Sequence, residues 1–147
     1  MINFESAEHS PSAPPPAKRP TVDVLVIDDE EAIRIVMADC LTQLGYTHRC
    51  ATDGMAAIAL MQTYCFRLVV TDIFMPRMDG IELIMHCRTA APEALIVACS
   101  GGGGHNQDNY ALESAKLMGS KRVLVKPFTV PEFATLVREM IGPGLAD

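Results

Sequence analysis

The stretch VVTDIFMPRMDG, residues 69–80, decides the fold of this chain. It begins as an apolar run that predicts a buried strand, and the run stops at one carboxylate, Asp72. A turn that contains Pro76 and Asp79-Gly80 follows and leads into a helical pattern. A single acid at the carboxyl end of a buried strand marks the edge where α/β proteins bind ligands. We therefore take Asp72 as the centre of the predicted site.

Length and composition predict one soluble globular domain. The chain has 147 residues, of which 49% are hydrophobic and 20% are charged, and its net charge is −6. No apolar run is long enough to span a membrane. The start lacks the basic-then-apolar order of a secretory signal, which favours a cytoplasmic protein. The negative charge and the lack of a basic stripe argue against a nucleic-acid partner.

Composition also divides the chain into three parts. Residues 1–20 are rich in serine and proline, so they are predicted to be a disordered tail. Residues 21–141 carry the folded domain, and residues 142–147 form a short C-terminal tail. Because so few residues follow the last predicted helix, we expect either a stand-alone domain or a part cut from a longer protein.

The cysteines form no C-x-x-C pair and no metal-ligand pattern. There are five of them: Cys40, Cys50, Cys65, Cys87 and Cys99. We interpret them as reduced core residues rather than as a catalytic thiol. Cys99, in the apolar run 94–99, fits this interpretation best.

Strand patterns and helix patterns alternate five times along the folded part. Strands are expected at residues 22–27, 46–51, 67–71, 95–99 and 122–125. Helices are expected at about 33–44, 53–64, 80–88, 107–118 and 130–141, and Val36 and Met85 are among the residues expected to face the core. This order predicts a parallel sheet that is covered by helices on both sides.

Four strands end in polar or charged residues, namely Asp28-Asp29, Asp72, Ser100 and Lys126. Each has an ordinary explanation alone, such as a helix cap, a turn or a surface residue. Together they indicate chemistry, because three gathered carboxylates need a cation such as Mg²⁺ to relieve their repulsion. Lys126 and Ser100 add a positive charge and a hydroxyl donor that suit phosphate. Since a carboxylate can attack phosphorus, the set predicts phosphoryl transfer to Asp72.

At these positions the sequence resembles the receiver domain of bacterial two-component response regulators. The matching segments are residues 26–30, residues 72–80, Ser100 and residues 126–128. The resemblance extends over about residues 21–141. It implies a flavodoxin-like (βα)5 fold, a doubly wound parallel sheet with strand order 2-1-3-4-5, and a site between the first and third strands.

The resemblance also implies a role for each acid. Asp72 would accept a phosphoryl group from a histidine kinase or a histidine phosphotransfer protein. Asp29 and Asp72 would ligate Mg²⁺ directly, together with the backbone carbonyl of Phe74. Asp28 would act on the ion largely through water.

The resemblance further implies how the phosphoryl group is contacted and how the signal leaves. Ser100 and Lys126 would contact the phosphoryl oxygens, and the bond between Lys126 and Pro127 would be cis. Val123 stands where the family often has an aromatic ring, so an aromatic switch is not expected there. We expect the signal to pass through Ser100, Gly101 and Gly102 instead, which changes the region 101–123.

Three functions are compatible with these residues. The leading one is a signalling phosphoacceptor, a monomer or weak dimer that contacts a downstream protein through about residues 107–141 or relays its phosphate onward. A second is a degenerate receiver that serves only as a docking module. A third is a Mg²⁺-dependent phosphohydrolase or phosphomutase, but Phe74 stands where such enzymes place a general acid. Phe74 and Gly102 also offer no side chain to orient water, so we expect at most slow autodephosphorylation.

Overall fold

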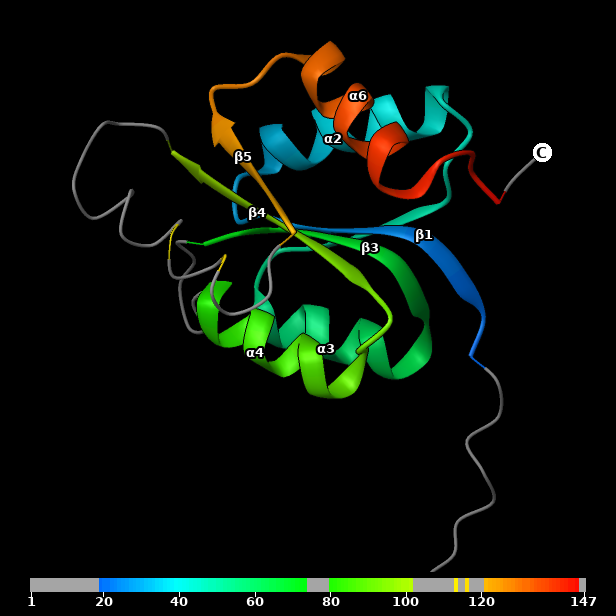
Figure 1. Cartoon of the computed structure of the whole chain (residues 1–147), viewed down its shortest axis with the longest axis vertical. Coiled ribbons are helices and arrows are strands. Elements are labelled where there is room, and N and C mark those ends of the chain that lie inside the picture. The colour runs from blue at the N-terminus through cyan, green and yellow to red at the C-terminus, as the bar shows by residue number, and fades with distance from the viewer. Residues whose placement is uncertain (1–18, 74–79, 102–112, 114–115, 117–120, 146–147) are drawn as a thin grey trace, which may run out of the picture.

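The computed structural model describes residues 19–73, 80–101, 113, 116 and 121–145. The described residues form a five-stranded sheet with helices on both of its faces (Figure 1). The strands are β1 (Thr21–Ile27), β2 (His48–Ala51), β3 (Cys65–Asp72), β4 (Leu95–Gly101) and β5 (Arg122–Lys126). The helices are α2 (Glu31–Gln43), α3 (Gly54–Thr63), α4 (Gly80–Ala90) and α6 (Val130–Ile141).

The sheet has the order β2-β1-β3-β4-β5, and all of its neighbouring strands are parallel. This confirms the predicted flavodoxin-like fold. Helices α2 and α6 lie on one face, and α3 and α4 lie on the other (Figure 1). Successive residues of β1 divide between the two cores: Val24 and Val26 pack with the first pair of helices, and Leu25 and Ile27 pack with the second.

The predicted inner faces of two helices were wrong at one residue each. Val36 is 42% exposed, because it lies at the edge of the stripe on α2 that contains the buried Met37 and Leu41. Met85 is 52% exposed, because α4 turns Leu83, Ile84 and Cys87 toward the sheet instead. Both errors follow from the helical period, since one residue is a rotation of about 100°.

The helix expected at 107–118 falls almost entirely outside the described residues. Glu113 and Lys116 are described, have helical backbone, and form an ion pair of 3.8 Å. Both side chains are exposed to solvent, so this pair contributes little to stability.

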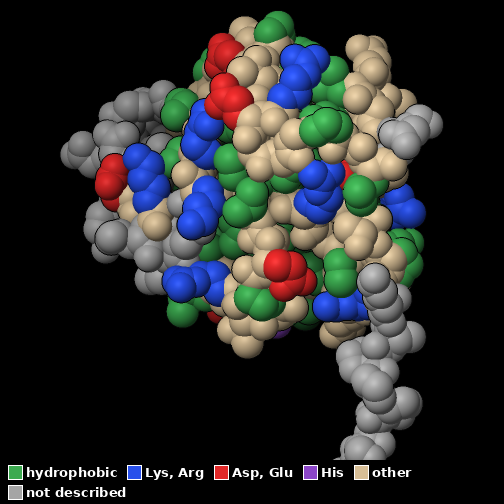
Figure 2. Space-filling model, turned by 45° about the vertical axis from the view of Figure 1, so that its right-hand side comes forward, with side chains coloured by type: hydrophobic (Ala, Val, Ile, Leu, Met, Phe, Trp, Pro, Cys, Tyr) green, Lys and Arg blue, Asp and Glu red, His purple; other side chains and the backbone are tan. Residues whose placement is uncertain are grey.

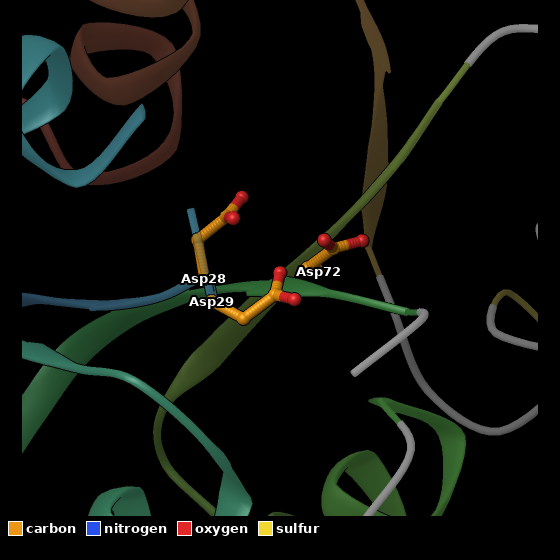
Figure 3. A group of neighbouring side chains, drawn as sticks. All are labelled: Asp28, Asp29 and Asp72. Atoms are coloured by element: carbon orange, nitrogen blue, oxygen red, sulfur yellow. The ribbon is translucent and has the colours of Figure 1, made fainter. Parts of the chain in front are cut away.

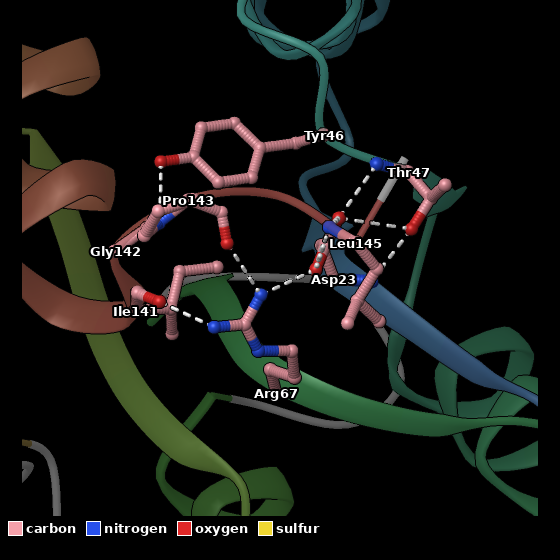
Figure 4. Close-up of polar contacts among 8 residues, drawn as sticks. All are labelled: Asp23, Tyr46, Thr47, Arg67, Ile141, Gly142, Pro143 and Leu145. Atoms are coloured by element: carbon pink, nitrogen blue, oxygen red, sulfur yellow. Dashed lines mark hydrogen bonds and ion pairs between the residues drawn. The ribbon is translucent and has the colours of Figure 1, made fainter. Parts of the chain in front are cut away.

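A second polar cluster lies at the amino ends of the strands, opposite the carboxyl edge where Asp72 lies. We call it the amino-edge cluster: Asp23, Tyr46, Thr47, Arg67, Ile141, Gly142, Pro143 and Leu145 (Figure 4). Its centre is Asp23, which is 0% exposed and forms an ion pair of 2.6 Å with Arg67. The backbone N–H groups of Thr47 and Leu145 also donate to this carboxylate, at 2.9 and 3.0 Å.

The amino-edge cluster fastens the end of α6 and the segment after it. Arg67 donates to the backbone carbonyls of Ile141 and Pro143, and the hydroxyl of Tyr46 donates to that of Gly142 at 2.5 Å. Gly144 approaches the backbone of Gly45 so closely that no side chain fits at that position. The cluster therefore satisfies carbonyl groups that a helix end leaves without intrahelical partners.

Among the described residues, no helix combines the length and the apolar character needed to cross a bilayer.

Candidate functional site

The carboxyl ends of β1 and β3 lie side by side, which places two acidic segments at one edge of the sheet. Ile27 pairs with Thr71 in the ladder, so Asp28 and Asp72 leave their strands at the same level. Figure 3 shows the side chains of Asp28, Asp29 and Asp72 gathered at this edge. The structure thus brings together the three acids that the sequence analysis singled out.

The three carboxylates are close enough to share one cation. Each offers one oxygen, and these oxygens lie within 4.8 Å of one another. Asp28 and Asp72 are 1% and 6% exposed, whereas Asp29 is open to solvent. Because like charges buried side by side destabilise a fold, the cluster requires a positive charge next to it.

Lys126, the last residue of β5, supplies one such charge. Its Nζ donates to Asp28 Oδ2 at 2.7 Å and to Asp72 Oδ2 at 3.2 Å. Burial alone would lower the pKa of Lys126, but the hydrogen bond to Asp28 and the charge of Asp72 outweigh burial and raise the pKa to about 12. Lys126 therefore stays charged at physiological pH. The bond from Lys126 to Pro127 is cis, as the family resemblance implied.

The hydroxyl of Ser100 lies at the same edge and is fully buried. Ser100 follows Cys99, which pairs with Asp72 in the β3–β4 ladder. Among the described residues, nothing forms a hydrogen bond with Ser100 Oγ. Leaving a buried hydroxyl unpaired costs roughly 1–3 kcal/mol. A hydroxyl in this position is suited to donate to an anion that enters beside Asp72.

The acid cluster fits a hard divalent cation. Its donor atoms are carboxylate oxygens, which Mg²⁺ prefers, and the exposed Asp29 leaves the cluster open to solvent on one side. Asp28, Asp29 and Asp72 are therefore the residues that could hold the ion. The backbone carbonyl of Phe74, the other expected ligand, lies outside the described residues.

Two residues that hold Asp28 were missed in the sequence. The backbone N–H of Glu30 donates to Asp28 Oδ1 at 2.9 Å, and Arg34 Nη1 donates to the backbone carbonyl of Asp28 at 2.8 Å. Glu30 is the N-cap residue of α2, so neither Asp28 nor Asp29 takes that position. The available signal was Arg34 itself, since a cation in the first turn of a helix opposes the helix dipole.

The predicted switch residues are only partly within the described chain. Gly101 ends β4 and pairs with Lys126 in the β4–β5 ladder, and Val123 is half-buried in β5. Gly102 lies outside the described residues. The predicted route from Ser100 through the glycines therefore stays a prediction.

Replacing Lys126 with methionine should make stability depend on a divalent cation. The variant leaves Asp28 and Asp72 buried without their shared ammonium, so we expect a loss of about 3 kcal/mol in unfolding free energy in chelator. Added Mg²⁺ should restore much of that loss by supplying the missing charge. Thermal unfolding with chelator and with Mg²⁺ measures both effects.

Lys121→Met is the matched control, because Lys121 is exposed and precedes the same strand. We expect it to unfold like the unmodified chain in both conditions. A Lys126→Met chain that is as stable as the unmodified one in chelator would show that the ammonium does not neutralise the acids.

The cysteines are all free, but they are not all in the core. Cys40, Cys87 and Cys99 are buried as expected, and burial raises the pKa of the Cys87 thiol to about 11. The core interpretation was wrong for Cys50, which is exposed because β2 is an edge strand, while Cys65 is half-buried. A raised pKa keeps the buried thiols of Cys40, Cys87 and Cys99 protonated, so these three cysteines are poor nucleophiles.

Charged side chains of both signs are spread over the face in Figure 2, with apolar side chains between them. Lysine and arginine side chains are more prominent on this face than acidic ones, so the face does not mirror the net charge of −6 of the whole chain.

Comparison with known proteins gives one consistent result. The family model described as the response regulator receiver domain matches residues 24–138. A probable chemotaxis protein CheY of Rhizobium etli is 31% identical over 125 residues, which cover 82% of this chain and 93% of the relative. The sensor kinase CckA of Brucella abortus is 33% identical, and the match covers 80% of this chain but 12% of that protein.

Solved structures agree with the sequence matches. The receiver domain of NtrX from Brucella abortus superposes with a TM-score of 0.74 at 30% identity, and the match covers 81% of this chain and 98% of that one. CheY4 of Vibrio cholerae gives a TM-score of 0.73 at 25% identity over 84% of this chain and all of that one.

Proposed function

Because this chain belongs to the response regulator receiver domain family, we propose that Asp72 accepts a phosphoryl group in two-component signalling. One observation supports the proposal most: the Asp72 carboxylate lies beside two further acids, a bridging ammonium and a buried hydroxyl to which no described residue is hydrogen-bonded. This set of groups suits a phosphoryl group, because Lys126 offers a positive charge and Ser100 a hydroxyl donor to its anionic oxygens.

In the proposed reaction an oxygen of Asp72 attacks phosphorus. The bond from phosphorus to the donor breaks, the donor leaves with the electron pair, and a mixed anhydride remains on Asp72. Lys126 would then exchange one of its carboxylate partners for a phosphoryl oxygen, and Ser100 would donate its O–H to another phosphoryl oxygen. When bound, Mg²⁺ supplies positive charge that offsets the repulsion between the acids and the incoming group.

We further propose that the donor is a histidine kinase or a histidine phosphotransfer protein, and that the protein acts in the cytoplasm. The match to part of a sensor kinase supports a place beside such proteins. The free thiols fit a reducing compartment. The output would be contact with a downstream protein through about residues 107–141, or relay of the phosphate onward. Nothing beyond slow self-dephosphorylation is proposed as an enzymatic activity.

A small phosphodonor tests this proposal without knowledge of the kinase. We expect phosphoramidate or acetyl phosphate to phosphorylate the chain when Mg²⁺ is present and not when a chelator replaces it. Intact-mass spectrometry measures incorporation, and removal of the donor then measures how slowly the phosphate is lost. Incorporation that is equal in chelator would contradict the cation site, and loss within seconds would contradict the slow self-dephosphorylation.

A further inference from the structure

Arg34 places a positive charge at the amino end of α2, where helix electrostatics do not favour one. It lies in the first turn of α2, which begins at Glu31, and a positive charge there is disfavoured by the helix dipole. Side chains on a helix point back toward its amino end. The guanidinium of Arg34 accordingly reaches the end of β1, where Nη1 donates to the backbone carbonyl of Asp28 at 2.8 Å.

This bond completes the hold on Asp28. The backbone N–H of Asp28 donates to Ala51 at 3.2 Å, and its two carboxylate oxygens accept from Glu30 and Lys126 at 2.9 and 2.7 Å. With Arg34 on the carbonyl, both the side chain and the backbone of Asp28 are fixed. The peptide unit that Arg34 holds is the one that leads directly to Asp29.

Asp29 depends on that peptide unit. Its carboxylate is exposed, yet its nearest oxygen lies within 4.8 Å of an oxygen of Asp28 and of Asp72. Among the described residues, none donates a hydrogen bond to this carboxylate. The backbone therefore sets where the Asp29 side chain starts and the direction of its Cα–Cβ bond, and no described hydrogen bond to the carboxylate adds to this.

We infer that Arg34 is a positioning residue for the cation site: by holding the carbonyl of Asp28, it aims the carboxylate of Asp29 at the ion. The inference rests on the proposed function, because it requires that the acid cluster binds a divalent cation. Arg34 does not need to touch the ion or the phosphoryl group to have this role.

The change in Mg²⁺ affinity on removal of Arg34 distinguishes a positioning role from a purely electrostatic one. Arg34 carries a positive charge beside three acids, so its removal should strengthen cation binding if charge alone matters. If Arg34 positions Asp29, its removal should weaken binding, because supporting hydrogen bonds around a metal site are typically worth about 10- to 100-fold in affinity. The two explanations therefore predict opposite changes.

The experiment is calorimetric titration of Mg²⁺ into the metal-free full chain and three variants. We expect Arg34→Gln to bind Mg²⁺ about tenfold more weakly. Arg34→Lys can still donate to the carbonyl and should recover much of the affinity. Arg138→Gln is the matched control, because it removes the same charge from the last turn of α6 and should leave binding unchanged.

The rate of phosphorylation by a small phosphodonor gives a second readout. With Arg34→Gln, the Mg²⁺ concentration for half-maximal rate should rise about tenfold, while the rate at saturating Mg²⁺ stays near that of the unmodified chain. If the variant is less stable, the rise in Tm that Mg²⁺ produces still reports its affinity.

Equal or tighter Mg²⁺ binding by Arg34→Gln would overturn the inference and leave the proposed function standing, provided that the unmodified chain binds Mg²⁺ and is phosphorylated. An unmodified chain that neither binds Mg²⁺ nor accepts phosphate would overturn both.

Discussion

Asp72→Asn is expected to abolish phosphorylation of the chain by a small phosphodonor. The amide is close to the carboxylate in size, but its oxygen is a poor nucleophile and it carries no negative charge. The substitution should not unfold the protein, since Lys126 retains its 2.7 Å contact with Asp28 and one buried charge is removed. Intact-mass spectrometry after incubation with donor and Mg²⁺ should show the unmodified mass alone.

Asp53→Asn is the matched control for this variant. Asp53 caps α3 by accepting a hydrogen bond from the backbone N–H of Ala56 at 2.8 Å, and asparagine caps helices about as well. The control makes the same chemical change away from the acid cluster, so it should be phosphorylated normally. If Asp72→Asn is phosphorylated as fully as the unmodified chain, another residue is the phosphoacceptor. A chain that is folded but never phosphorylated would favour the docking-module alternative.

Arg67→Met is expected to lower the free energy of unfolding by about 3 kcal/mol, which corresponds to roughly 10 °C in Tm. The variant leaves the carboxylate of Asp23 fully buried without its ion-pair partner. It also removes the donor to the carbonyl groups of Ile141 and Pro143, so the end of α6 loses its anchor. Chemical and thermal unfolding at neutral pH measure the effect.

Arg122→Met is a suitable control, because Arg122 and Glu139 form an ion pair of similar length, 2.9 Å, that is exposed on both sides. Exposed pairs contribute about 0–1 kcal/mol, so this variant should lose far less stability. If Arg67→Met and Arg122→Met lose similar amounts of unfolding free energy, the burial of Asp23 does not determine how much its ion pair with Arg67 contributes to stability.

The effect of Arg67→Met should also depend on pH. Burial alone would raise the pKa of Asp23, but hydrogen bonds from Leu145, Arg67 and Thr47 outweigh it and hold the pKa below its ordinary value of 3.8. The ionised form therefore stabilises the fold above that value, and this stabilisation is lost as pH falls through the lowered pKa. The difference between the variant and the unmodified chain should accordingly narrow in strong acid.

The sequence predicted the site best where a polar residue ends an apolar strand and the strands are parallel. Asp28, Asp72, Ser100 and Lys126 each end an apolar run, and parallel strands place such ends at one edge whatever the details of packing. The helical spacing of apolar residues predicted the helix at 130–141, whose bounds the structure reproduces. Periodicity was weaker for Val36 and Met85, where an error of one residue turns a side chain out of the core.

Contacts between distant residues could not be predicted. Asp23 stood inside an apolar strand and received no role, because its partners Arg67 and Leu145 are 44 and 122 residues away. Arg34 was missed for a different reason. It donates to a backbone carbonyl, and every residue type has one, so the residue at position 28 does not reveal the bond.

Lys126 also has a consequence for how the chain folds as it is made. The ammonium that joins Asp28 and Asp72 comes from the last strand and is 98 residues from Asp28. Until β5 docks, the pairing of β1 with β3 brings two acids together with no internal counter-charge, so that pairing is opposed by repulsion. A nascent chain without residues 122–126 would therefore hold Asp28 and Asp72 without the ammonium that contacts both of them in the folded protein. If Asp72 accepts phosphate as proposed, it would gain that ability only after β5 has been made and has joined the sheet.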